Sequence, residues 1–389
     1  QTVKERQQAF ISRGIACRPS KTQTMALSSK NVVLTGCTAG IGQQIAVQLV
    51  PLGINNFILV NRNRAKTDSV ISELRASGSN VQRFHSVTAD CGEPGQMDRA
   101  VKEITAILED EQNMAIGSST GRGVLHIFIN NAGIWQANKE FKAKSPLKNS
   151  KDQELHFATN YLSNVILANG LRPLLETATE ESGGANPGRV IITGSFTSWE
   201  IAKGKLDVKN LSGEKHTSGK MPVCNDITYG QSKLCQHMWA RWFARETSDP
   251  IKKLHVIVFC PGVVESSIDV VQTMKKMIPK CIRSCMMKFR VPEQAATIPA
   301  FLCQQEGAAF SQIEAFHGEA GLYCDCGKTG TPKLEKVFPP SGGVTEQNMK
   351  KAFLCRLETY PTYGRKTAPS TADWAKVEEL VAYTEKELS

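Results

Sequence analysis

Short apolar segments that alternate with helix-like segments constrain the fold of this chain most. From residue 31, β-branched and apolar runs alternate with segments that place apolar residues every three or four positions. The runs are apolar throughout, which is typical of strands buried on both faces of a parallel sheet. The predicted strands are 31–34, 56–60, 81–88, 124–129, 189–193 and 255–259. The predicted helices are 43–52, 65–77, 95–109, 152–176 and 228–246. This order predicts an α/β fold with a single doubly wound, Rossmann-type parallel sheet.

The remaining segments flank this sheet. We predict a basic amino-terminal tail or targeting segment over 1–30, the sheet domain over 31–326, and an extension over 327–389 that ends in a helix at about 372–388. Residues 1–24 fit either a basic transit segment or an upstream tail. We expect a cytoplasmic protein, or an organellar one if 1–24 form a transit segment.

Charge and composition exclude several classes of protein. The chain carries a net charge of +10, but residues 1–30 hold six Lys and Arg with one Glu, and 271–290 hold six Lys and Arg with no acid. The basic charge therefore belongs to two segments, and no nucleic-acid surface is expected. The 12 cysteines include no Cys-x-x-Cys, so we expect reduced thiols and no metal site. No apolar run approaches the ~18 residues of a spanning helix.

A glycine-rich turn joins the first predicted strand to the first predicted helix. Residues 35–42 read Thr-Gly-Cys-Thr-Ala-Gly-Ile-Gly. Glycines allow a left-handed backbone and the close approach of a ligand, and the N–H groups of a helix start bind negative charge. We therefore predict a dinucleotide site. Its residues are Gly36, Thr38, Gly40, Ile41 and Gly42.

Arg62 bears on which dinucleotide binds. The second predicted strand ends in Asn61-Arg62, where an NAD site usually has a carboxylate, and no acid follows before Asp68. A guanidinium binds a 2′-phosphate through two charge-assisted hydrogen bonds, whereas a carboxylate repels it. Arg62 thus predicts NADP(H) rather than NAD(H); an ordinary solvated arginine is the alternative.

Tyr229 and Lys233 are a candidate proton-transfer pair. Tyr229 alone among six tyrosines has a Lys four residues later, on a predicted helix. Positions i and i+4 share a face, so the ammonium is expected to lower the phenol pKa from its ordinary value of about 10. Such a phenol exchanges the proton that accompanies hydride transfer at a carbonyl or carbinol. Ser195 follows the strand at 189–193, where its hydroxyl can bind the substrate oxygen.

Taken together, these motifs resemble the short-chain dehydrogenase/reductase family from residue 31 to about 266. The match includes T-G-x-x-x-G-I-G at 35–42, N-N-A-G at 130–133 and Y-x-x-S-K at 229–233. The resemblance implies a catalytic set of Asn160, Ser195, Tyr229 and Lys233. It adds further cofactor contacts, which are Asp90, Asn131, Ala132, Gly133, Tyr229, Lys233, Pro261, Gly262, Val264 and Ser266.

Within that family the chain is most similar to the retinol dehydrogenase branch. The similarity lies in the helix at 152–175, the segment 204–211 and the Ser-Lys-Leu at 232–234. Cys37 and Ala39 depart from the usual first turn, and Gly194 stands where the branch usually has a second serine. Residues 327–370 match no known pattern.

The resemblance implies a specific activity. It is hydride transfer between NADP(H) and a carbonyl or alcohol of a hydrophobic substrate, such as a retinoid, a steroid or a lipid-like molecule. Tyr229 would exchange the proton, and Lys233 would lower the phenol pKa and bind the nicotinamide ribose. Ser195 would hold the substrate oxygen, and Asn160 would continue the proton relay. Family members often form homodimers through the helices that here contain Asn160 and Tyr229.

The segment at about 266–292 corresponds to the family's substrate flap. Within it, 274–290 mixes basic residues with Met, Ile and Phe. This pattern fits a lid that contacts an anionic membrane peripherally, and it fits equally a helix with a solvated basic face.

Two alternative functions stay open. One is a catalytically silent NADPH-binding regulator or scaffold, and the presence of all four catalytic residues weighs against it. The other is an alkene reductase resembling protochlorophyllide oxidoreductase, and the N-N-A-G at 130–133 weighs against that.

Overall fold

The core of the molecule is a parallel β-sheet. The computed structural model describes residues 27–113, 121–135, 146–195, 197–200, 206–214, 224–246, 249, 251–262, 264, 291–305, 322–324 and 373–389. The strands are β1 Asn31–Thr35, β2 Asn56–Asn61, β3 Arg83–Thr88, β4 Ile127–Asn130, β5 Arg189–Thr193, β6 His255–Cys260 and β7 Leu322–Cys324. Their order in the sheet is β3-β2-β1-β4-β5-β6-β7, and every neighbouring pair is parallel. The predicted Rossmann-type α/β class is confirmed.

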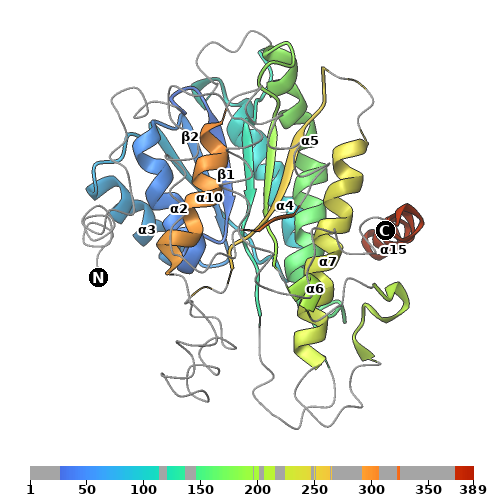
Figure 1. Cartoon of the computed structure of the whole chain (residues 1–389). Helices are drawn as coiled ribbons and strands as arrows, with labels where there is room; N and C mark the ends of the chain where they lie inside the picture. The colour runs from blue at the N-terminus through green and yellow to red at the C-terminus, as the bar shows by residue number, and fades with distance from the viewer. Residues whose placement is uncertain are drawn as a thin grey trace, which may run out of the picture.

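Helices cover both faces of the sheet (Figure 1). One face carries α2 Gly40–Leu49, α3 Arg64–Ala76 and α10 Pro292–Gln304. The other carries α4 Pro94–Glu109, α5 Ser163–Glu181 and α7 Cys224–Arg245. The short elements are η2 Val50–Leu52, η3 Glu111–Asn113, α6 Thr197–Glu200 and η5 Val208–Asn210.

The central strands are buried on both sides because alternate residues enter two separate cores. Val33, Ile58 and Phe128 point into the core beneath α4, α5 and α7. Their neighbours Leu34 and Phe57 point into the core beneath α2, α3 and α10. All five side chains are fully buried. Such burial on both faces explains why these strands are apolar throughout.

The predicted helix at 152–176 is not regular. It contains a six-residue π-helix, η4 Phe157–Leu162, which leads directly into α5. Single π turns inside helices occur frequently at functional sites. Asn160 lies within η4, so the irregular turn falls at a predicted site residue.

The terminal helix α15, Trp374–Leu388, packs against α7 and η5 and contacts η4 through Tyr161. Its Val377 and Leu380 are buried in the core shared with those helices. Thr384 and Tyr161 share a hydrogen bond of 2.7 Å between their hydroxyls. No helix in the described part of the chain combines the length and apolarity needed to cross a bilayer.

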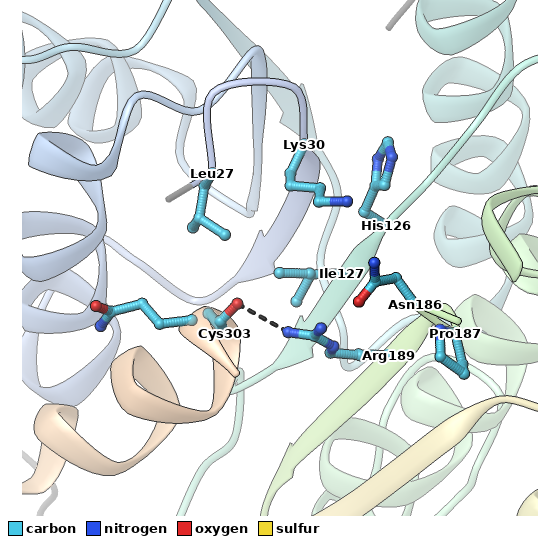
Figure 2. A pocket seen from close by; sticks show the side chains of 9 residues that line it. Leu27, Lys30, His126, Ile127, Asn186, Pro187, Arg189 and Cys303 are labelled. Carbon is cyan, nitrogen blue, oxygen red and sulfur yellow. Dashed lines mark hydrogen bonds between the residues drawn. The ribbon is translucent and has the colours of Figure 1, made fainter. Parts of the chain in front are cut away.

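A pocket lies at the amino-terminal ends of β1, β4 and β5 (Figure 2). There Arg189 donates to the carbonyl oxygens of Leu302 at 3.3 Å and Cys303 at 2.9 Å, at the last turn of α10. The pKa of the adjacent His126 is lowered to about 3 by burial and then by the charges of Lys30 and Arg189. Arg189 therefore fastens α10 to the sheet, at the end opposite to the predicted ligand site.

Several predictions lie outside the described residues. They concern the tail over 1–24, Ser266, the basic segment 274–290 and the stretch 327–370.

Candidate active site

The glycine turn begins directly after β1 and depends on two close backbone contacts. Gly36 has φ +71°, and a Cβ there would lie 2.7 Å from Ala132 Cα. A Cβ on Gly42 would lie 2.0 Å from the Gly36 carbonyl oxygen and 2.4 Å from Asn131 Nδ2. Neither position has room for a side chain. The two glycines therefore let α2 begin close to the ends of β1 and β4.

The start of α2 is suited to hold an anion. Within the described residues no side chain caps its N-terminus, and its first turn holds no acid. Gly40, with φ +59°, would meet nothing within 4 Å if it carried a Cβ. The space beside Gly40 is thus open, and an uncapped helix start with a favourable dipole fits a dinucleotide pyrophosphate.

Thr35 holds the glycine turn against the end of β4. Its hydroxyl donates to Asn130 Oδ1 at 3.1 Å and accepts from the backbone N–H groups of Asn131 at 3.0 Å and Ala132 at 2.9 Å. Asn131 in turn donates through Nδ2 to the carbonyl of Gly36 at 3.0 Å. This network fixes the crevice at the point where the strand order reverses, which is where ligands bind in such sheets.

Five further predicted cofactor residues border the same edge. Arg62 follows β2 and is exposed. Asp90 follows β3, is partly buried, and accepts the N–H of Gly92 at 2.8 Å. Pro261, Gly262 and Val264 follow β6, at the carboxyl end of that strand.

Asn160 and Lys233 lie buried between β4, β5 and α7. Asn160 accepts the N–H of Ile134 at 2.8 Å and donates to Ser232 Oγ at 2.9 Å. Lys233 donates through Nζ to the Thr193 carbonyl at 2.9 Å and is only 4% exposed. A Cβ on Gly133 would lie 3.0 Å from Asn160 Oδ1 and 3.5 Å from Lys233 Nζ. The predicted catalytic amide and amine therefore meet at the end of the N-N-A-G loop.

Tyr229 and Ser195 meet on the same side of the crevice. The Tyr229 hydroxyl hydrogen-bonds Ser195 and Thr197. Thr197 also donates its own hydroxyl to Ser195 Oγ at 2.9 Å. Lys233 Nζ lies 5.9 Å from the centroid of the Tyr229 ring. All four predicted catalytic residues thus converge on one buried cluster.

The pKa of Tyr229 shifts in the direction opposite to the one that the Tyr-x-x-x-Lys spacing predicts. Burial raises it from 10.0 to about 12, because the buried phenolate loses its hydration, and the hydrogen bonds to Ser195 and Thr197 only partly offset this. Burial also lowers the pKa of Lys233 from 10.5 to about 7. Near neutral pH the phenol is therefore protonated and the amine is only partly charged.

Four residues at this cluster were not among the predicted site residues. Thr197 bonds Ser195, and Trp135 stacks on the Tyr229 ring with centroids 4.6 Å apart and planes 3° apart. His156 faces the same ring edge-on, at 6.1 Å and 74°, and bonds buried Glu154. Trp135 directly follows the N-N-A-G-Ile segment, which is the one sequence signal for it. His156 and Glu154 lie in the helix at 152–175 that resembles the retinol dehydrogenase branch, but no motif there assigns them a role.

Comparison with known proteins agrees with this geometry. Residues 30–203 match the family model described as short chain dehydrogenase. The chain is 25% identical over 343 residues to the short chain dehydrogenase rstn4 of Aspergillus nomiae, covering 85% of this chain and 81% of that protein. It is 29% identical over 250 residues to retinol dehydrogenase 12 of Mus musculus, covering 64% and 65%.

A solved structure resembles the fold. The RhlG/NADP active-site complex of Pseudomonas aeruginosa superposes with a TM-score of 0.50 at 22% identity, covering 72% of this chain and 91% of that one. The fold and the sequence matches agree with the motifs. Over residues 30–203 the chain is therefore similar to the short-chain dehydrogenase family, and retinol dehydrogenases are among its relatives.

Proposed function

We propose that this chain is an NADP(H)-dependent oxidoreductase that transfers a hydride between nicotinamide and a carbonyl or alcohol of a hydrophobic substrate. The observation that carries the proposal is the convergence of three buried groups beside the glycine turn. They are the phenol of Tyr229, the hydroxyl of Ser195 and the amine of Lys233.

Residues at the ends of β1, β2 and β3 and one residue on α7 would hold the cofactor. The N–H groups that follow Gly36 would bind the pyrophosphate, and Arg62 would bind a 2′-phosphate. Asp90 would contact the adenosine portion, and Lys233 the nicotinamide ribose. When bound, NADP(H) supplies or accepts the hydride. The chain's own residues position the substrate and transfer the proton.

Tyr229 is suited to donate a proton. Since its pKa is raised to about 12, the phenol holds its proton at neutral pH and can give it to a substrate oxygen that gains negative charge. Ser195 would fix that oxygen with a hydrogen bond. Asn160, which is hydrogen-bonded to Ser232, would support the proton relay that returns a proton to Tyr229. This arrangement favours carbonyl reduction.

The substrate is proposed to be a retinoid, a steroid or a lipid-like molecule. Trp135 provides a partly buried aromatic surface directly on the Tyr229 ring. The relatives include a retinol dehydrogenase, whose name refers to an apolar alcohol. The homodimer and the peripheral membrane contact stay predictions.

A variant of Tyr229 tests the activity. We expect the wild-type protein to oxidise NADPH with at least one member of a panel of retinoids, steroids, fatty aldehydes and small ketones. Tyr229→Phe should lower kcat by about 10²–10⁴-fold while the Kd of NADPH is nearly unchanged. Tyr383→Phe, which removes a phenol hydroxyl on α15, is the matched control and should retain activity. A Tyr229→Phe protein with wild-type turnover would refute the proposed role and favour a silent NADPH-binding protein.

A variant of Arg62 tests the cofactor preference. Arg62→Ala should weaken NADPH binding by about tenfold or more, because one charged partner of the 2′-phosphate is lost, and should leave NADH binding nearly unchanged. Arg64→Ala is the control, since Arg64 is exposed in the same turn but pairs with Asp68 at 3.1 Å. Fluorescence titration measures both constants. Equal affinity of the wild type for NADH and NADPH would contradict the preference.

A further inference from the structure

Glu154 and His156 form a buried pair that the proposed chemistry does not use. The Nδ1 atom of His156 lies 2.7 Å from Glu154 Oε1, and the two residues are 0% and 2% exposed. Removing a carboxylate from water costs several kcal/mol unless close partners satisfy it. Both carboxylate oxygens have such partners here, the His156 ring and the Phe157 N–H, and the His156 ring in turn contacts the element of Tyr229.

The second carboxylate oxygen contacts the element of Asn160. Glu154 Oε2 accepts the backbone N–H of Phe157, the first residue of η4, at 2.6 Å. The Glu154 carbonyl also accepts the N–H of Ala158 at 2.9 Å. Glu154 therefore fixes the beginning of the helical turn from which Asn160 projects.

His156 contacts the element of Tyr229. Its Nδ1 lies 3.3 Å from the hydroxyl of Thr228, the residue before Tyr229, and its ring edge faces the phenol ring. Because a carboxylate only accepts hydrogen bonds, Nδ1 carries the hydrogen that Glu154 receives. One carboxylate thus orients the imidazole that borders the phenol.

The pair is enclosed by the segment that follows β5. A Cβ on Gly213, whose φ is +74°, would lie 2.7 Å from Thr228 Cγ2 and 3.7 Å from Glu154 Cγ. Glu154 and His156 are therefore placed to act through Tyr229 and Asn160 rather than on a substrate.

We propose that the Glu154–His156 pair positions the catalytic groups: it holds the Tyr229 ring in a fixed place and orientation relative to Asn160. It rests on the proposed function, in which Tyr229 transfers the proton. Small displacements of a reacting group lower rates strongly, so the pair should affect turnover more than ligand binding.

Three single variants and one double variant test this role. The amide nitrogen of Asn occupies about the position of imidazole Nδ1, so His156→Asn keeps a donor for Glu154, whereas His156→Leu keeps the bulk and loses the donor. We expect His156→Leu to lower kcat by about 10–100-fold, with the KM of the carbonyl and the Kd of NADPH within about twofold of wild type. His156→Asn should recover most of the turnover. Glu154→Gln should resemble His156→Leu. The double variant Glu154→Gln/His156→Leu should lose no more turnover than the worse of its two single variants.

The outcomes separate this inference from the proposed function. If Tyr229→Phe is as active as wild type, the proposed function fails. If Tyr229→Phe is inactive but His156→Leu turns over like wild type, the positioning role alone fails. If His156 merely fills space, His156→Leu should have a higher turnover than His156→Asn. That result, or a loss of NADPH affinity in parallel with kcat, would overturn the inference.

Discussion

At the scale of single residues, burial decides the properties of the proposed proton-transfer pair. Attraction between an ammonium and a phenolate favours a low pKa for Tyr229, but loss of hydration opposes it, and in this cluster the loss of hydration is the larger effect. Loss of hydration also lowers the pKa of Lys233 and so favours its uncharged amine.

The pKa of Lys233 predicts how stability changes with pH. Between about 7 and 10.5, the unfolded chain keeps a proton on this amine that the folded protein has lost, so the free energy of unfolding rises with pH. The cost of burying the ammonium is fully present below this window and is relieved across it, with a limiting slope of about 1.4 kcal/mol per pH unit.

Lys233→Met removes this titration while it retains the bulk of the side chain. We therefore expect the stability of wild type relative to Lys233→Met to increase with pH across the window, as measured by urea unfolding. A difference that does not change with pH would contradict the lowered pKa.

At the scale of elements, the site depends on how closely α2 and η4 approach the strand ends. The position of α2 follows from the glycines, which the sequence predicts. The π-helix η4 changes which side chains face the site and depends on contacts with α7, such as the bond from Asn160 to Ser232. Apolar periodicity therefore predicts a helix at 152–176 without its irregular turn.

Gly42 provides a test of the approach of α2. Gly42→Ala places a methyl 2.0 Å from the Gly36 carbonyl oxygen, so α2 must move. We expect destabilisation by about 1–3 kcal/mol and a loss of NADPH affinity. Gly95→Ala in the first turn of α4 meets nothing within 4 Å and should be neutral or slightly stabilising. Thermal unfolding and NADPH titration check both variants, and unchanged NADPH affinity in Gly42→Ala would argue against this packing.

At the scale of the whole molecule, two cores and a terminal helix support the site. The core beneath α4, α5 and α7 extends to α15, and Arg245 lies 3.8 Å from the centroid of the Trp374 ring. The outer sides of η4 and α7 are thus covered by a segment far away in sequence.

Leu380 measures the contribution of α15. It is 0% exposed, so Leu380→Ala should lower the free energy of unfolding by about 2–5 kcal/mol. Glu378→Ala, on the exposed side of α15, should change it by less than about 0.5 kcal/mol. Urea denaturation compares the two variants. Equal stability of Leu380→Ala and wild type would mean that α15 does not contribute to the core.

Local patterns in the sequence determined the sheet, the glycine turn and the resemblance to the short-chain dehydrogenase family. Apolar runs indicate strands that are buried on both faces of the sheet. The glycines at 36 and 42 indicate positions where the backbone packs too closely for a side chain. Strand β7 was missed because it has three residues and forms only by pairing with β6.

The tertiary structure alone decided the environment of the reacting groups. It buried Tyr229 and Lys233 deeply enough to reverse the expected shift of the phenol pKa, and it brought Trp135, His156 and Glu154 around the ring. A side chain loses its hydration only when segments distant in sequence bury it. The spacing of two residues along one helix does not predict that burial.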